Sequence, residues 1–287
     1  MSGPWRWALP REGGIHPPPP RPGTPSAALR GVASIGASVS RSLASSGVAK
    51  PARLPDFLGI GAQKSGTTWL HANLAAHPEV FLPEAKELHW LDWNWHRGPH
   101  AYATWFAAAG SRLAGEITPA YAIAPPSRIR DATRLMPGLK AIYLLRDPIE
   151  RAWSQAVMNL ERYGDGLGSE AALLAHLASE PVIARSLHSR AIDRWSEFVP
   201  SDRTLIGFFE EIADEPAALL RRVLGFLGVD PNPRVEFPLR SVVNRGEGTP
   251  MPEAARSLLV ERLGEELVEL DRRFGGPASA WRRRGLG

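Results

Sequence analysis

A short strand that ends in glycine and leads directly into a helix is the feature that most constrains this chain. Residues 57–62 (FLGIGA) are an apolar run that predicts a buried strand, and residues 67–76 are expected to form a helix. The chain must turn sharply between them, and Gly61 and Gly66 permit such a turn. This arrangement directs several backbone N–H groups at one point beside a helix N-terminus, which favours phosphate binding.

The side chains of this turn support the phosphate interpretation. Lys64 places a positive charge inside it, and Thr67 and Thr68 bring hydroxyl donors to the first turn of the helix. An ordinary glycine turn with capping threonines is the alternative. The order Lys-Ser-Gly-Thr at 64–67 differs from the Gly-Lys-Ser/Thr order of nucleoside triphosphatases.

Further strands and helices alternate along the chain. Apolar runs predict strands at 113–116, 140–145 and 204–208, and helices are expected at about 148–161, 216–227 and 252–274. This alternation predicts an α/β fold, a single domain over residues 55–275 with a central parallel sheet flanked by helices. In such folds the ligand lies beyond the carboxyl ends of the strands.

The first 54 residues differ in composition from the rest. They contain nine of the 27 prolines, and seven basic side chains against one acidic, a net charge of +6. Since the whole chain carries +4, residues 55–287 carry −2. This composition predicts a disordered Pro/Ala/Ser/Arg-rich tail over 1–54, with a targeting peptide or a polyproline ligand as alternatives. Residues 276–287 are expected to be a short basic tail.

Several classes of protein are excluded or disfavoured. The chain has no cysteine, which excludes disulfides and thiolate metal sites, and no apolar run of about 18 residues that would span a membrane. His89, His96 and His100 do not have a zinc-binding spacing, so we expect no metal. A nucleic-acid-binding domain has an excess of basic residues on its folded body, so we expect no nucleic-acid partner.

Two segments together resemble a known family. Residues 64–69, Lys-Ser-Gly-Thr-Thr-Trp, resemble the 5′-phosphosulfate loop of sulfotransferases that use 3′-phosphoadenosine-5′-phosphosulfate (PAPS). Arg146, which closes a strand, and Ser154, eight residues later on a helix, resemble the family's 3′-phosphate segment. A guanidinium suits phosphate because its N–H groups form a planar fork. For Arg146 and Asp147 alone, a surface ion pair is the alternative.

Two other segments resemble the carbohydrate branch of this family, which includes heparan-sulfate-like enzymes. Residues 84–90 are similar to its Lys-Glu-x-His-aromatic segment, and residues 115–121 (GEITPAY) to a second typical stretch. The chain departs from the family at 187–189, where a tyrosine is common. It also departs at 244–248, where Arg245 and Gly246 are the nearest match to the C-terminal cofactor loop.

The resemblance implies a P-loop-like fold and transfer of a sulfuryl group from PAPS to a hydroxyl or amine, with adenosine 3′,5′-bisphosphate (PAP) as product and no metal. It implies that Lys64 acts at the leaving phosphate and that Glu87 is the general base, with His89 as the alternative base. Trp69 is expected to lie against the adenine. The residues expected to bind the donor are Gln63, Lys64, Ser65, Gly66, Thr67, Thr68, Trp69, Arg146, Ser154, Arg245 and Gly246.

Other interpretations stay open. A phosphate-loop kinase would use Asp147 as a magnesium ligand, and a catalytically inactive nucleotide-binding protein would retain only the fold. The tryptophans at 90, 93, 95 and 105 fit either a core or a platform for a sugar or aromatic acceptor. We expect a cytoplasmic protein with a saccharide or small-molecule acceptor. The sequence leaves the identity of the acceptor and the oligomeric state open.

Overall fold

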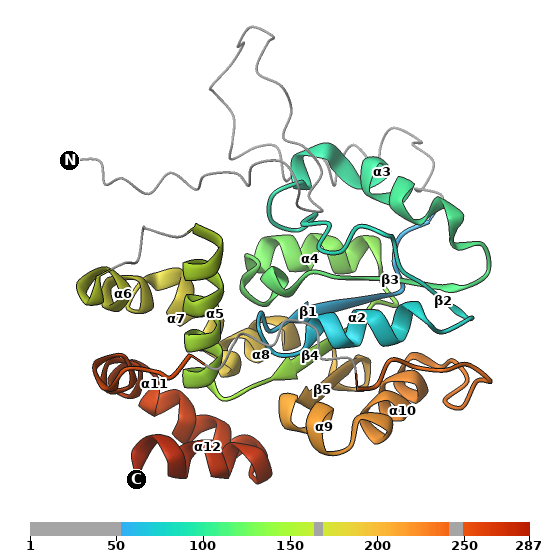
Figure 1. Ribbon diagram of the computed structural model, residues 1–287. Helices are drawn as coiled ribbons and strands as arrows, with labels where there is room; N and C mark the ends of the chain where they lie inside the picture. The colour runs from blue at the N-terminus through green and yellow to red at the C-terminus, as the bar shows by residue number, and fades with distance from the viewer. Residues whose placement is uncertain (1–52, 164–168, 241–248) are drawn as a thin grey trace, which may run out of the picture.

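A five-stranded parallel sheet forms the centre of the protein, with strand order β2-β3-β1-β4-β5 (Figure 1). The computed structural model describes residues 53–163, 169–240 and 249–287. Most of the expected N-terminal tail, residues 1–52, therefore lies outside the described residues. The strands are β1 (Phe57–Gly61), β2 (Val80–Phe81), β3 (Leu113–Ile117), β4 (Lys140–Leu145) and β5 (Thr204–Phe208).

Both faces of this sheet are buried, as the continuous apolar strands predict. Along β4, Tyr143 and Leu145 belong to one hydrophobic cluster, whereas Ile142 and Leu144 belong to the other. Successive side chains of a strand point to opposite faces, so each strand contributes to two cores. The expected α/β fold with a central parallel sheet is therefore confirmed.

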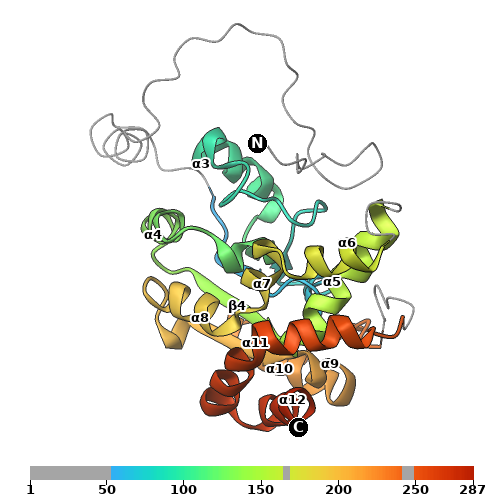
Figure 2. The same cartoon turned by 90° about the vertical axis from the view of Figure 1, so that its left-hand side faces the viewer.

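Helices cover both faces of the sheet. In Figure 1, α4 lies above it, α9 and α10 lie below it, and α5, α6, α7, α11 and α12 gather on the left. Figure 2 shows α11 running across the front of that left-hand side. The α-helices are α2 (Thr67–Ala75), α3 (Gly98–Ala103), α4 (Pro126–Leu135), α5 (Pro148–Tyr163), α6 (Glu170–Leu177), α7 (Glu180–Ser186), α8 (His188–Ser196), α9 (Phe209–Asp214), α10 (Pro216–Leu227), α11 (Glu253–Phe274) and α12 (Gly276–Leu286). Short 3₁₀ segments are η1 (Trp95–Arg97), η2 (Thr104–Ala109), η3 (Pro119–Ile123) and η5 (Ser201–Arg203).

The C-terminal segment is a correction to the sequence interpretation. Residues 276–286 form helix α12, which packs on α11, instead of a basic tail. Trp281 is 1% exposed, and its indole N–H donates to Glu210 Oε1 at 2.6 Å. The run of arginines suggested a solvated end, but Ala278 and Trp281, three residues apart, place one apolar stripe of the helix in the core.

The parallel sheet brings the chemically informative segments to one edge. All strands point the same way, so the loops that follow β1, β2, β3 and β4 leave from the same side. These loops contain Lys64, Glu87, Thr118 and Arg146, respectively.

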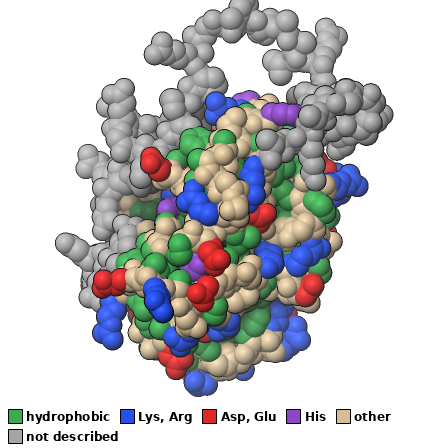
Figure 3. Space-filling model, turned by 90° about the vertical axis from the view of Figure 1, so that its right-hand side faces the viewer, with side chains coloured by type: hydrophobic (Ala, Val, Ile, Leu, Met, Phe, Trp, Pro, Cys, Tyr) green, Lys and Arg blue, Asp and Glu red, His purple; other side chains and the backbone are tan. Residues whose placement is uncertain are grey.

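Two surface observations bear on membranes and charge. None of the helices in the described ranges is long and apolar enough to cross a bilayer. On the face drawn in Figure 3, basic and acidic side chains are interspersed over the described residues. A nucleic-acid-binding face is typically dominated by basic side chains.

Candidate active site

The loop between β1 and α2 forms an open anion cradle, which we call the donor loop (residues 62–68). Lys64 and Gly66 adopt left-handed φ angles of 69° and 86°. The φ of 86° at Gly66 favours glycine, because a residue with a Cβ would be strained there, and that Cβ would also crowd the end of the Ile212 side chain. Within the described part of the chain no side chain caps the N-terminus of α2, so its first-turn N–H groups are available to an anion.

A buried hydroxyl in this loop fits a phosphate oxygen. Ser65 is fully buried, and its Oγ has no hydrogen-bond partner within the described residues. Buried polar atoms are rarely left unpaired, because each costs about 1–3 kcal/mol. An oxygen of the donor's 5′ end would accept this hydrogen bond, so the residues present fit the phosphate end of the nucleotide.

Arg146 is tied directly to the donor loop. Its Nη1 donates to the carbonyl oxygen of Lys64 at 2.8 Å, and its guanidinium lies 4.5 Å from the ring centre of Phe209. Burial lowers the pKa of Arg146. Ser154 lies on α5 and is half-buried. The described contacts thus join Arg146 to the donor loop, whereas the role of Ser154 stays a prediction.

His188, in the 187–189 segment at the start of α8, contacts the backbone of Arg146. It is fully buried, with Nε2 2.9 Å from the carbonyl oxygen of Arg146 and Nδ1 2.8 Å from the hydroxyl of Tyr143. The carbonyl only accepts, so Nε2 carries the proton and Nδ1 accepts from Tyr143. Burial, followed by the charge of Arg151, lowers the pKa of His188 to about 3, so this imidazole is neutral.

Asp147 has a structural role instead of a metal-binding one. Its Oδ1 accepts from the N–H groups of Ile149 and Glu150 at the start of α5, and its Oδ2 pairs with Arg284 at 3.0 Å. Both oxygens are engaged, which argues against a magnesium ligand and hence against the kinase alternative. No cluster of three or more His, Asp or Glu side chains suited to a metal occurs in the described parts of the chain.

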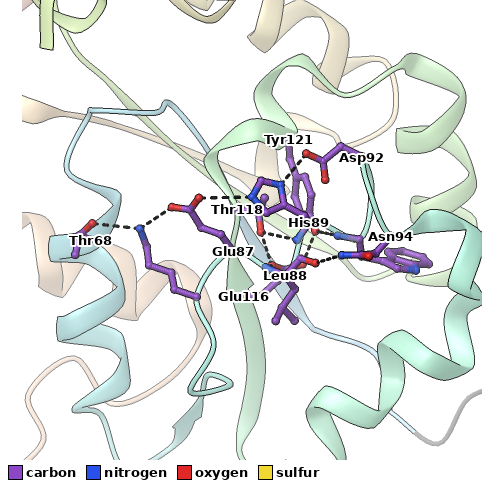
Figure 4. Close-up of polar contacts among 11 residues, drawn as sticks. Thr68, Glu87, Leu88, His89, Asp92, Asn94, Glu116, Thr118 and Tyr121 are labelled. Atoms are coloured by element: carbon purple, nitrogen blue, oxygen red, sulfur yellow. Dashed lines mark hydrogen bonds and ion pairs between the residues drawn. The ribbon is translucent and has the colours of Figure 1, made fainter. Parts of the chain in front are cut away.

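The segment after β2 carries the candidate base, and we call residues 84–94 the base loop (Figure 4). Glu87 Oε1 lies 3.0 Å from Lys86 Nζ, and Glu87 Oε2 lies 3.7 Å from His89 Nε2. His89 Nδ1 in turn lies 2.8 Å from Asp92 Oδ2. The order along the loop is therefore ammonium, carboxylate, imidazole, carboxylate.

These contacts set the protonation states of the two candidate bases. Burial disfavours a charged His89, but hydrogen bonds with Asp92 and Glu87 outweigh it and raise the pKa of His89 to about 9. Burial likewise raises the pKa of Glu87, but His89 and Lys86 outweigh it and lower the value to about 2. At neutral pH His89 is therefore a cation and Glu87 a carboxylate paired with Lys86 and His89. Of the two side chains, only the carboxylate is in a form that accepts a proton, and its role as the base stays a prediction.

The backbone conformation singles out the same residues. Lys64, Glu87 and His89 are the three non-glycine residues in the described ranges with positive φ, at 69°, 63° and 51°. Such conformations are costly for a residue with a Cβ and cluster at functional sites. The three residues that the sequence predicts as catalytic are these same three.

Three consecutive N–H groups fasten the base loop to the end of β3. Leu88 N donates to Glu116 Oε2 at 3.3 Å, His89 N to Thr118 Oγ1 at 3.4 Å, and Trp90 N to the hydroxyl of Tyr121 at 2.7 Å. The acceptors belong to the 115–121 segment that the sequence analysis singled out. Its structural function is therefore to hold the base loop in its strained conformation.

Glu116 is the centre of this attachment. It is 2% exposed and accepts hydrogen bonds from the hydroxyls of Tyr102 at 2.5 Å, Tyr121 at 2.7 Å and Thr118 at 2.6 Å, besides Leu88 N. Burial raises the pKa of Glu116, whereas these donors favour the charged form. With both oxygens engaged, Glu116 is not accessible to a substrate.

The tryptophans divide into core and surface. Trp90 is 2% exposed and stacks on Tyr102 at 4.2 Å, so it belongs to the core. Trp93 is 61% exposed and stacks on His89 with ring centres 3.7 Å apart and planes at 10°. Trp93 therefore places an exposed aromatic surface next to the candidate base.

Four of the residues predicted to bind the donor receive no such support. Trp69 is 4% exposed, packs in the core and donates its indole N–H to the carbonyl of Leu239 at 2.9 Å, which leaves little of its ring to meet an adenine. Arg245 and Gly246 lie outside the described residues. Their roles stay predictions, as does that of Gln63.

Lys86 contacts both loops of the candidate site, although the sequence alone gave it no role there. Its Nζ donates to Glu87 Oε1 at 3.0 Å and to Thr68 Oγ1 at 3.2 Å, so it joins the base loop to the donor loop. Lys86 is one of only four lysines in a chain with 34 basic residues. This scarcity, together with its place beside Glu87, was the available signal.

Comparisons with known proteins agree with this geometry. Residues 54–245 match the family model of the sulfotransferase domain. The chain is 28% identical over 199 residues to the human bifunctional heparan sulfate N-deacetylase/N-sulfotransferase 2, a match that covers 62% of this chain and 22% of that protein. It is 28% identical over 253 residues to the human heparan sulfate glucosamine 3-O-sulfotransferase 6, covering 77% of this chain and 71% of that protein.

A solved structure supports the fold as well. The crystal structure of a sulfotransferase from Alicyclobacillus acidocaldarius superposes with a TM-score of 0.63 at 25% identity, and the match covers 81% of this chain and all of that one. The chain spans only about a fifth of the N-deacetylase/N-sulfotransferase that it matches. Because the family model covers well over half of the chain, this protein belongs to the sulfotransferase domain family.

Proposed function

We propose that this protein transfers a sulfuryl group from PAPS to a hydroxyl, or an amine, of a saccharide or small-molecule acceptor, and leaves PAP as the product. The observation that carries the proposal is the position of Glu87. It is an ionised carboxylate, and one lysine side chain separates it from Thr68 of the donor loop.

The donor loop supplies binding and charge compensation. The N–H groups at the start of α2, with Ser65, Thr67 and Thr68, bind the 5′ end of the donor, and Arg146 and Ser154 bind its 3′-phosphate. Lys64 balances the negative charge that develops on the leaving phosphate oxygen, as preorganised charge does in other group transfers. The donor itself supplies an activated sulfuryl group, and we propose that no metal is needed.

The base loop supplies the proton acceptor. Glu87 takes the proton of the acceptor hydroxyl, a role worth about 10²–10⁴-fold in rate for a well-placed base. His89, a cation held by Asp92, keeps Glu87 oriented and ionised until the acceptor arrives. Lys64 and Glu87 are both present, which favours an active enzyme over an inactive nucleotide-binding protein.

A saccharide is the acceptor class that we favour. The curated relatives reported above are named for heparan sulfate, a polysaccharide. The exposed ring of Trp93, beside the base, offers an aromatic surface of the kind that lines small-molecule sites. We also propose that the protein works in the cytoplasm, where the activated sulfate donor is made.

Ligand-dependent thermal stability tests this proposal against the kinase alternative. We expect PAP with a chelator to raise the unfolding midpoint, because a ligand that binds only the folded state stabilises it. ATP with magnesium should change the midpoint little. The reverse result would refute PAPS-dependent transfer and favour a kinase.

A further inference from the structure

Lys86 bridges two loops that perform different parts of the proposed reaction. Its ammonium lies 3.2 Å from Thr68 Oγ1 in the donor loop and 3.0 Å from Glu87 Oε1 in the base loop. Figure 4 shows this continuous line from Thr68 to Glu87 and on to His89. The side chain of Lys86 is 19% exposed and that of Glu87 29%, so the pair is partly shielded from solvent.

The charge of Lys86 also acts on the helix that carries the donor loop. His71 lies one turn after Thr68 on α2, and burial together with the charge of Lys86 lowers its pKa to about 4. His71 is therefore neutral, and it does not supply a second cation beside Lys86. In the free protein, the carboxylate of Glu87 is the charged group that Lys86 contacts.

Anion binding at Thr68 would give Lys86 a second charged group to contact. A 5′-phosphate at the donor loop places negative charge beside the ammonium of Lys86. Ammonium–phosphate hydrogen bonds are charge-assisted and about twice as strong as neutral ones. The phosphate and Glu87 are then two anionic partners of one ammonium, and each charge opposes the presence of the other.

We propose that Lys86 is a positioning residue that couples the donor loop to the base. It holds Glu87 while the donor loop is empty, and it turns to the anionic 5′ end when a nucleotide binds, which releases Glu87 for the acceptor. This inference rests on the proposed function. It assigns to Lys86 a task distinct from that of Lys64, which lies within the donor loop itself.

Thermodynamic coupling makes this arrangement testable without turnover. If nucleotide binding weakens the hold of Lys86 on Glu87, then the charge of Glu87 must weaken nucleotide binding by the same factor. Loss of that charge should therefore tighten PAP binding, although the substitution removes a residue from the active site. If Glu87 had only a structural role, loss of its charge would not tighten PAP binding.

The experiment is calorimetric titration of PAP, with a chelator present, into the wild type, Glu87→Gln, Lys86→Met and the double variant. We expect Glu87→Gln to tighten binding about 5- to 10-fold, in the lower part of the usual coupling range. Lys86→Met should weaken binding, and Glu87→Gln should have no further effect in the Lys86→Met background. Asp92→Asn is the matched control, because Asp92 lies in the same loop and contacts His89 rather than Lys86.

Each other outcome has a defined meaning. Unchanged PAP affinity in Glu87→Gln, equal tightening in Asp92→Asn, or tightening that persists in the double variant would overturn the coupling. If the wild type does not bind PAP at all, the proposed function fails rather than this inference. Lys86→Gln serves as a second substitution should Lys86→Met unfold at a markedly lower temperature than the wild type.

Discussion

The donor loop and the base loop obtain their geometry in different ways. The donor loop lies between β1 and α2, and its turn depends on local features, chiefly Gly66 and the start of the helix. The base loop is irregular, and side chains from β3 and η3, about 30 residues away in sequence, hold it in place. The nucleotide end of this site therefore depends mostly on local features, with a tertiary hydrogen bond from Arg146 to Lys64, whereas the chemical end depends on several tertiary hydrogen bonds.

The largest expected effect follows from substitution in the donor loop. Lys64→Ala should lower transfer from PAPS by about 10³-fold, as expected when a preorganised group that stabilises developing charge is removed. Turnover with labelled donor measures this loss. Near-normal transfer in Lys64→Ala would show that the donor loop does not contribute a charge to the reaction.

Substitution of the base should reduce the chemical step and spare the nucleotide site. Glu87→Gln should lower kcat by about 10²–10³-fold, because an amide does not accept the acceptor's proton. PAP binding, measured by calorimetry, should not weaken. If Glu87→Gln turns over normally and His89→Gln does not, then the base is His89.

Substitution of Glu116, the buried carboxylate that holds the base loop, should affect the base loop and not the donor loop. Glu116→Gln leaves hydroxyl donors facing an amide N–H₂, so we expect about 2 kcal/mol lower stability and a kcat about 10-fold lower. Donor affinity should be nearly unchanged.

Glu266→Gln is the matched control for this substitution. Glu266 is also buried, at 5% exposed, and accepts from the N–H and hydroxyl of Ser189 on α8. It should lose similar stability and retain kcat. Equal kcat losses in Glu116→Gln and Glu266→Gln would show that Glu116 has no specific link to the base loop.

The smallest effect is a dependence on pH. The pKa of His89 is raised from 6.5 to about 9, so its stabilising interactions are complete below pH 6.5 and disappear as the pH rises through about 9. The pKa of Glu87 is lowered from 4.5 to about 2, so its contribution is complete above pH 4.5 and disappears as the pH falls towards 2. Activity should therefore decline above about pH 9, and NMR titration of His89 should give the same value.

Asp92→Asn provides the test of this assignment. It removes the hydrogen-bonded carboxylate that raises the pKa of His89. The midpoints of the pH–activity curve and of the NMR titration of His89 should therefore both move to lower pH. A His89 titration that is unchanged in Asp92→Asn would contradict the account of the base loop.

The sequence predicted the regular parts of the fold, whereas the roles of the catalytic candidates stay predictions. Strand β1, the helix α2 and the units β4–α5 and β5–α10 follow from apolar runs and glycines, because these patterns report local structure. The two-residue strand β2 and the packing of α12 lack such a signal: β2 is too short for a period, and arginines mask the apolar stripe around Trp281.

The contacts within the site could not be predicted in the same way. Motif resemblance indicated residues 115–121, but it did not reveal that Glu116 binds the backbone of Leu88. Nor did it reveal that Lys86 spans from Thr68 to Glu87, since this depends on how the loops after β1 and β2 approach each other. The protonation state of His89 likewise depends on the position of Asp92, which the sequence does not reveal.

The central claim is that a nucleotide-bound sulfuryl group and an acceptor meet between the donor loop and Glu87. The most direct measurement is transfer of label from [³⁵S]PAPS to a panel of saccharide and small-molecule acceptors, in the presence of a chelator, with PAP release followed in parallel. We predict labelled acceptor and an equal amount of PAP with the wild type, and about 10³-fold less of both with Lys64→Ala. Absence of labelled product from every acceptor, or equal labelling by wild type and Lys64→Ala, would contradict the account.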